Sequence, residues 1–107
     1  MNKVALITGS TRGIGRALSI GLAKKGYNIV VTGKTVDKNP SLPGTIYSVA
    51  NEVEKEGVKA LPIVLDVRDE GSVIDMYKTI KNKFNRLDII INNAGALHWK
   101  PIEETSM

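Results

Sequence analysis

Cysteine is absent from the 107 residues of this chain, and histidine and tryptophan each occur once. The lack of cysteine excludes disulfides, thiolate zinc sites and cysteine nucleophiles within it. No stretch approaches the ~20 uninterrupted apolar residues that a membrane-spanning helix needs, and the first residues lead into an expected strand rather than a signal sequence. We therefore expect a protein without a membrane span. The cytoplasm is the default expectation, and a peroxisome or mitochondrion stays open.

The excess of positive charge is small. Lys and Arg number 15 against 11 Asp and Glu, which gives a formal net charge of +4. The cations are spread along the chain rather than gathered in a run, so the charge pattern does not indicate a nucleic-acid partner. A mildly basic domain does favour a polyphosphate ligand through long-range attraction, provided that particular residues build the site.

Apolar runs of strand length alternate with segments of helical periodicity. Runs that predict strands lie at residues 4–8, 29–32, 60–67 and 88–92. Between them, apolar residues recur three or four positions apart, which indicates three helices. The residues that mark these helices are Ile14, Ala17, Leu18, Gly21 and Leu22 for the first, Ile46, Val49, Ala50 and Val53 for the second, and Val73, Tyr77, Ile80 and Phe84 for the third.

This alternation predicts an α/β fold with a doubly wound parallel sheet in three layers, because nearly continuous apolar strands need helices on both faces. Right-handed crossovers would join the strands. Pro62 lies inside the third strand and cannot donate a ladder hydrogen bond, so we expect that strand at an edge. The Rossmann strand order 3-2-1-4 meets this requirement. At 107 residues, the chain is long enough for one domain, over 1–107, and too short for two.

A glycine-rich turn joins the first strand to the first helix: Gly9, Ser10, Thr11, Arg12, Gly13, Ile14 and Gly15. Backbone N–H groups and the helix dipole at such a place can hold a pyrophosphate. Gly9 would permit the tight exit from the strand, Gly13 would let the backbone approach phosphates, and Gly15 would let the helix pack near the sheet. The alternative is a turn that uses glycine merely to change direction.

The spacing TGxxxGxG at residues 8–15 resembles the glycine motif of short-chain dehydrogenases/reductases. Asp66-Val67, after the third strand, is similar to the family's adenine-ring contact, and residues 92–95 match its NNAG signature. Gly33-Lys34-Thr35 and the long loop that follows resemble the hydroxysteroid dehydrogenase-like branch. The resemblance covers about residues 3–95 and implies the NAD(P)-binding portion of an oxidoreductase.

The resemblance also implies a set of cofactor contacts. Asp66 would accept a hydrogen bond from the adenine amino group, with a turn aspartate as the alternative. We expect Asp69 to cap the third helix, which would leave Asp66 for the ligand. Residues Asn93, Ala94 and Gly95 would lie beside the nicotinamide ribose and steady the central sheet.

The cofactor preference implied by the resemblance is NADP rather than NAD. Strand two ends in Gly33 where NAD-preferring relatives tend to carry an acid, and Lys34 and Arg12 resemble the cations that hold the 2′-phosphate. The alternative is that both are solvated surface charges.

Family members use a tyrosine, a lysine and a serine to move a proton during hydride transfer between the cofactor and a carbonyl or alcohol. The one YxxxK match, Tyr77 to Lys81, precedes NNAG instead of following it, and Tyr77 falls on the apolar stripe of its helix. We therefore predict that Tyr77 is a core residue, that His98 is a surface residue and that Trp99 packs.

This chain is accordingly expected to hold the cofactor half of an enzyme and none of its catalytic residues. The alternative is a stand-alone nucleotide-binding or interaction module without catalysis. Expected partners are the dinucleotide and, for the parent protein, a small carbonyl or alcohol substrate. A homo-oligomer stays open.

Overall fold

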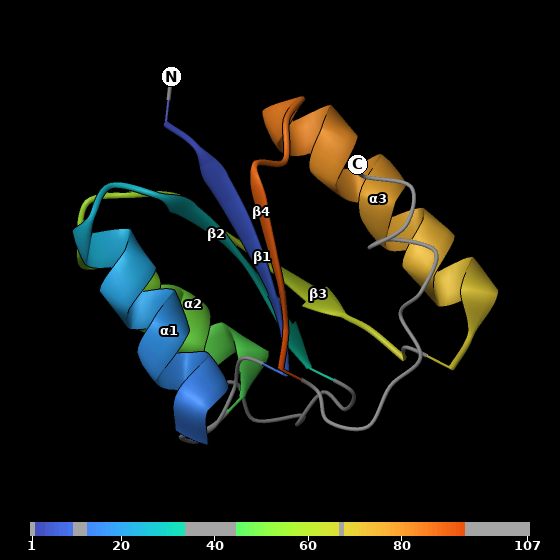
Figure 1. The fold of residues 1–107 in the computed structure, drawn as a ribbon, viewed down its shortest axis with the longest axis horizontal. Helices are drawn as coiled ribbons and strands as arrows, with labels where there is room; N and C mark the ends of the chain where they lie inside the picture. Colours follow the sequence, from blue (N-terminus) through green and yellow to red (C-terminus); the bar gives the residue numbers. More distant parts are fainter. Residues whose placement is uncertain (1, 10–12, 34–44, 67, 94–107) are drawn as a thin grey trace.

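The computed structural model describes residues 2–9, 13–33, 45–66 and 68–93. They form a four-stranded parallel sheet in the order β3-β2-β1-β4, with helices on both faces (Figure 1). The predicted α/β architecture and strand order are confirmed. The elements in chain order are β1 (Val4–Thr8), α1 (Gly13–Lys24), β2 (Asn28–Gly33), α2 (Ile46–Glu54), β3 (Ala60–Val64), α3 (Glu70–Phe84) and β4 (Ile89–Asn92).

The sheet register agrees with the apolar pattern of the strands. Every residue of β1 and β2 is buried, as expected for central strands covered on both faces. Pro62 lies opposite Val31 in β3, which is an edge strand as predicted. The strand ends at Val64 rather than at Val67 as the apolar run had suggested, and Asp66 follows two residues beyond it.

Two helices begin at polar side chains that satisfy their first N–H groups. Thr45 and Ser48 form a reciprocal capping box at α2, with both hydrogen bonds 3.0 Å long. Asp69 caps α3 by accepting a hydrogen bond from the Gly71 N–H at 2.9 Å, as predicted. Both helices therefore start where the sequence places a side chain able to accept from their free N–H groups.

Helix α1 packs on the sheet only partly through the residues expected to mark it: Leu18 and Leu22 pack against the core. Ile14, Ala17 and Gly21 are exposed, whereas Gly15, Ser19 and Ala23 are buried. The buried residues recur every four positions and are all small. The reason is close packing, because a face of small side chains lets the helix backbone approach the sheet.

The core consists of two apolar clusters, one on each face of the sheet. The α1 and α2 side contains Ile7, Ile29 and Val49 among others, and the α3 side contains Leu6, Val30 and Met76 among others. Figure 1 shows α1 and α2 on one face and α3 on the other. Within the described residues, no helix is long and apolar enough to cross a bilayer.

A charged cluster joins the amino-terminal ends of β1 and β4. The Asp88 carboxylate accepts a hydrogen bond from the Val4 N–H at 2.8 Å and two from the Arg86 guanidinium at 2.8 and 2.9 Å. The Asp88 N–H in turn donates to the Val4 carbonyl oxygen at 2.9 Å. Hydrogen bonds from Arg86 chiefly, and then from Val4, hold the pKa of Asp88 below its ordinary value of 3.8.

We expect the Asp88→Asn variant to lose one component of the acid sensitivity of folding. A folded-state pKa below the unfolded value stabilises the fold above that value, and this stability is lost as the pH falls through the folded pKa. Urea unfolding at a series of pH values should therefore show a smaller loss of stability below about pH 4 in the variant. Asp75→Asn, a change at an exposed carboxylate outside the described ion pairs, is the control. Equal acid profiles for Asp88→Asn and the wild type would contradict this account.

Candidate functional site

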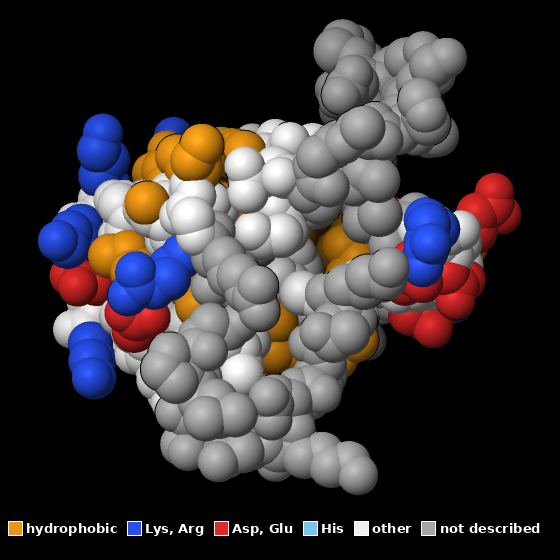
Figure 2. Space-filling view, turned by 90° about the horizontal axis from the view of Figure 1, so that it is seen from below, with side chains coloured by type: hydrophobic (Ala, Val, Ile, Leu, Met, Phe, Trp, Pro, Cys, Tyr) orange, Lys and Arg blue, Asp and Glu red, His pale blue; other side chains and the backbone are white. Residues whose placement is uncertain are grey.

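The carboxyl ends of the strands meet at one edge of the sheet, because all four strands are parallel. Gly9 follows β1, Gly33 ends β2 and Asn93 follows β4, so three predicted site segments lie at this edge (Figure 1). Seen from this edge, most of the visible acidic side chains lie on the side of α3 and most of the basic ones on the side of α1 and α2, with a few of the opposite charge on each (Figure 2). Open α/β sheets bind their ligands at such an edge.

Thr8 ties the end of β1 to the end of the neighbouring strand β4. Its side chain is fully buried, and its hydroxyl donates to Oδ1 of Asn92 at 3.1 Å while accepting from the Asn93 N–H at 2.9 Å. The hydrogen bonds fix the path of the chain where β4 leaves the sheet. No role was expected for Thr8, although a threonine at the end of an otherwise apolar strand is a signal for one.

Asn93 connects this pair of strands to the glycine turn. Its side-chain amide Nδ2 donates to the carbonyl oxygen of Gly9 at 3.2 Å. A Cβ atom on Gly15 would lie 2.6 Å from that Nδ2 and closer still to the Gly9 oxygen. Gly15 must therefore be glycine for helix α1 to sit where it does, as the sequence analysis expected.

The start of α1 is suited to an anionic ligand. Gly9 and Gly13 have φ angles of 63° and 53°, in the left-handed region that glycine tolerates. A Cβ on Gly13 would meet nothing within 4 Å, so the space beside it is open. The first turn of α1 contains no acidic residue, and the Ile14 side chain is 70% exposed. Free helix N–H groups, open space and an uncovered apolar side chain fit a pyrophosphate-bearing dinucleotide.

Asp66 takes part in a turn. Its Oδ1 accepts from the Arg68 N–H at 3.0 Å and from Arg68 Nε at 3.3 Å, and its backbone N–H donates to the Ser72 hydroxyl at 3.1 Å. Because Asp69 caps α3, Asp66 had been expected to be left for the ligand. Instead, Asp66 also has a structural role in this turn, which was the alternative considered. The side chain remains 40% exposed at the ligand-binding edge.

Several predicted residues lie outside the described ranges. These are Ser10, Thr11, Arg12, Lys34, Val67, Ala94, Gly95, His98 and Trp99. Their assignments stay predictions. Among the described residues, no group of three His, Cys, Asp or Glu side chains could hold a metal ion.

Tyr77 belongs to the packed face of α3. It is half-buried against the cluster on that side of the sheet, as predicted. Its hydroxyl oxygen is buried and has no hydrogen-bond partner among the described residues. Burial raises the pKa of Tyr77 to about 12, the opposite of the shift that a proton-transferring tyrosine needs near neutral pH.

The glycine turn, the NNAG segment and the strand order together define a dinucleotide-binding domain of the Rossmann type. A sequence model described as short chain dehydrogenase matches residues 3–107. The chain belongs to the short-chain dehydrogenase family.

Among curated relatives, the chain is similar to hydroxysteroid dehydrogenase-like protein 2 of several vertebrates. It is 46% identical to the Danio rerio protein over 101 residues, which are 94% of this chain and 24% of that protein. It is 47% identical to the Homo sapiens protein over 91 residues, 85% of this chain and 22% of the relative. The chain thus spans about a quarter of the length of these relatives.

Solved structures show the same fold. A short chain dehydrogenase from Mycobacterium thermoresistibile is 41% identical with a TM-score of 0.79, over 95% of this chain and 36% of that one. An NAD+-bound xylitol dehydrogenase is 30% identical with a TM-score of 0.76, over 88% of this chain and 34% of that one. These neighbours support an oxidoreductase-type domain with a dinucleotide partner.

Two glycines of α1 provide a matched test of the close approach. Gly15→Ala should lower the free energy of unfolding by about 1–3 kcal/mol, because the added methyl group forces the helix away from Gly9 and Asn93. Gly21→Ala should raise it by about 0.5–1 kcal/mol, since its Cβ meets nothing within 4 Å and alanine favours the helix. Urea denaturation measures both. Equal effects of the two substitutions would show that α1 does not depend on this contact.

Proposed function

We propose that this chain is the NADP-binding portion of a short-chain dehydrogenase that transfers hydride between NADP(H) and a carbonyl or alcohol substrate. The end of β2 carries the cofactor preference. β2 ends at Gly33, whose carbonyl oxygen accepts from the Leu65 N–H at 2.8 Å. An acidic residue in this place would accept from the ribose 2′-hydroxyl of NAD and repel the 2′-phosphate of NADP.

The residues around Gly33 favour the phosphate. Lys34 follows directly and supplies an ammonium, and Arg12 in the glycine turn supplies a guanidinium whose planar fork suits bidentate contact with phosphate. The start of α1, without an acid in its first turn, would hold the pyrophosphate. Asp66 would bind the adenine amino group with its exposed carboxylate, and Val67 would line the ring.

At the nicotinamide end of the ligand, Asn93 would hold the neighbouring backbone in place and would not take part in the reaction. Its side chain fixes the Gly9 carbonyl, and its N–H is fixed by Thr8. Ala94 and Gly95 present little bulk and would leave room for the nicotinamide ribose. When bound, the dinucleotide supplies the hydride, and this chain orients it.

The proposed NADP preference predicts that a double variant loses affinity for NADP but not for NAD. Lys34→Ala combined with Arg12→Ala should weaken NADP binding by well over tenfold and leave NAD binding nearly unchanged. The reason is that two charge-assisted contacts worth about 1.5–3 kcal/mol each are removed from the 2′-phosphate. Isothermal titration calorimetry with each cofactor measures the difference.

Lys25→Ala with Lys81→Ala removes the same charge from exposed positions away from this edge and controls for long-range attraction. The control should keep the NADP affinity of the wild type. Equal affinity of the wild-type chain for NADP and NAD would overturn the preference. Some neighbours carry NAD or NADH in their names, among them the NAD+-bound xylitol dehydrogenase and an NADH-dependent reductase. The comparison of the wild-type affinities for NADP and NAD therefore decides the preference.

The proton-transfer residues are proposed to lie outside this chain in the parent protein. Tyr77 is half-buried with a raised pKa, which makes it unsuitable as the acid or base. A spectrophotometric assay of the chain with NADPH and a panel of carbonyl compounds should therefore give no turnover. Turnover that Tyr77→Phe abolishes would show that Tyr77 is catalytic after all.

A further inference from the structure

A cavity of about 340 Å³ opens at the amino-terminal edge of the sheet, opposite the glycine turn. Val4 begins β1, Asn28 begins β2, and Lys59 directly precedes β3, and all three line it. Its volume lies in the range of sites that bind small molecules. Because the dinucleotide-binding edge is at the other ends of these strands, an occupant here would not compete with the cofactor.

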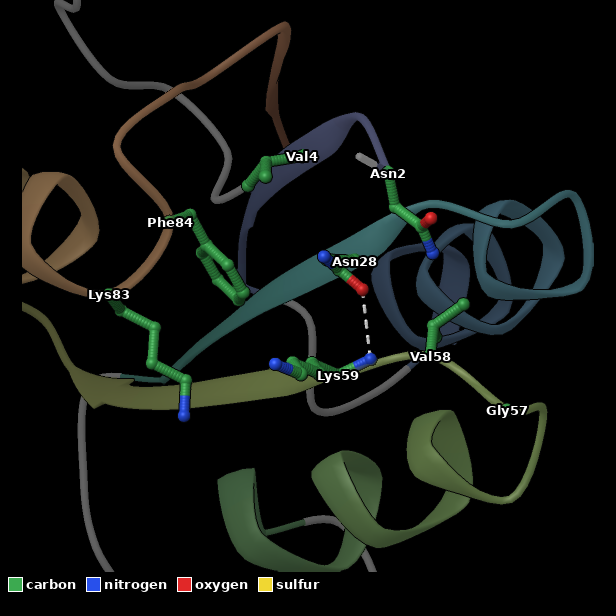
Figure 3. Close-up of a pocket in the computed structure, with 8 residues that line it drawn as sticks. All are labelled: Asn2, Val4, Asn28, Gly57, Val58, Lys59, Lys83 and Phe84. Carbon is green, nitrogen blue, oxygen red and sulfur yellow. Dashed lines mark hydrogen bonds between the residues drawn. The ribbon is translucent and has the colours of Figure 1, made fainter.

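Asn28 places an unused hydrogen-bond donor in this cavity. The residue is 8% exposed, and its Oδ1 accepts from the Lys59 N–H at 2.9 Å. That bond sets the orientation of the amide, since the Lys59 N–H requires an acceptor. Nδ2 consequently points the other way, into the space between Val4, Phe84 and Lys59 (Figure 3). No hydrogen-bond acceptor for Nδ2 occurs among the described residues.

Asn28 Nδ2 is not sealed from solvent, since the Tyr77 hydroxyl is the one buried side-chain atom without a hydrogen-bond partner among the described residues. Nδ2 is therefore open to the cavity, and the described residues provide no acceptor for it. A group from outside the chain that brings an oxygen atom would complete the hydrogen bonding of Asn28. The remaining lining then decides which kind of oxygen is favoured.

The charge of the lining favours an anionic oxygen. Lys59 and Lys83 both line the cavity with exposed side chains, and none of the described residues that line it is acidic. Figure 3 shows the two lysine side chains on the same side of the cavity as Asn28 Nδ2. Two ammonium groups and an amide donor match a carboxylate or phosphate group.

The other walls are apolar. Val4 and Phe84 are buried residues of the α3-side cluster, and Val58 belongs to the opposite cluster. Each of the three is at most 8% exposed, so only their edges reach the cavity, and the alkyl chains of the two lysines add to the apolar surface that a ligand can cover. The lining therefore combines cationic groups with apolar ones.

We propose that this cavity binds a small molecule in which a phosphate or carboxylate group is attached to an apolar body. The anionic oxygen accepts from Asn28 Nδ2 and is neutralised by Lys59 and Lys83, and the apolar body lies on Val4, Val58 and Phe84. The site is separate from the dinucleotide site and can be occupied together with it.

Phenyl phosphate is a suitable probe, and amide chemical shifts of the ¹⁵N-labelled chain report where it binds. Shifts should change for Asn2, Gly57 and Lys59, which line the cavity, with saturable binding. Inorganic phosphate, which lacks the apolar body, and benzyl alcohol, which lacks the charge, should each bind at least about tenfold more weakly, since each lacks one of the two classes of contact. Benzoate should bind at the same residues.

Three variants test the residues that carry the proposal. Lys59→Gln with Lys83→Gln, both at exposed positions, should weaken phenyl phosphate binding by at least about tenfold. Lys24→Gln with Lys78→Gln removes equal charge from exposed positions outside the cavity and should leave binding unchanged. Asn28→Asp keeps the acceptor for the Lys59 N–H, replaces the donor by a carboxylate, and should abolish binding.

The proposal is overturned if shift changes occur only at Gly13 to Gly15, which would place the probe at the glycine turn. It is overturned equally if the two lysine pairs weaken binding to the same extent, which would indicate general attraction to a basic surface. Should Asn28→Asp fail to fold, the lysine variants alone decide.

Discussion

The close approach of helix α1 to the end of β1 is the constraint on which the site depends. At Gly15 the helix comes so near the Gly9 carbonyl that no side chain can stand between them, and Asn93 holds that carbonyl from the β4 side. Thr8 joins Asn92 and Asn93 to the same strand end. Two segments far apart in the chain, residues 8–9 and 92–93, thereby share one set of hydrogen bonds, and α1 packs against them at Gly15. Because α1 begins at Gly13 and packs closely at Gly15, the N–H groups of its first turn lie at the carboxyl edge of the sheet.

The two edges of the sheet are built differently. At the carboxyl edge, glycines and short polar side chains leave backbone groups available, which suits a ligand recognised by its phosphates. At the amino edge, Asp88 and Arg86 join β1 to β4, while Asn28 joins β2 to the residue before β3. The same edge contains the cavity lined by Lys59 and Lys83. The parallel strands separate these regions, so each can be altered by substitution without touching the other.

Much of the fold could be predicted from the sequence, because apolar runs indicate which segments are buried and turn residues indicate where they end. The strand order followed from alternation and from Pro62, and the Asp69 cap from its place before α3. The buried face of α1 was predicted only in part: Gly15, Leu18 and Leu22 pack as expected, whereas Ser19 packs by being small rather than apolar. The link from Thr8 to Asn93 also escaped prediction, and the turn role of Asp66 had been only the alternative to its ligand role. Such hydrogen bonds depend on tertiary positions that periodicity does not encode.

The central claim is that the carboxyl edge of this sheet binds the dinucleotide. The most direct measurement is a titration of the ¹⁵N-labelled chain with NADP, followed by amide chemical shifts. The account predicts saturable shift changes at Gly9, Gly13 to Gly15 and Asn93, with Asn28 and Lys59 at the opposite edge unchanged. Changes confined to the amino-terminal edge, or none at saturating NADP, would contradict it.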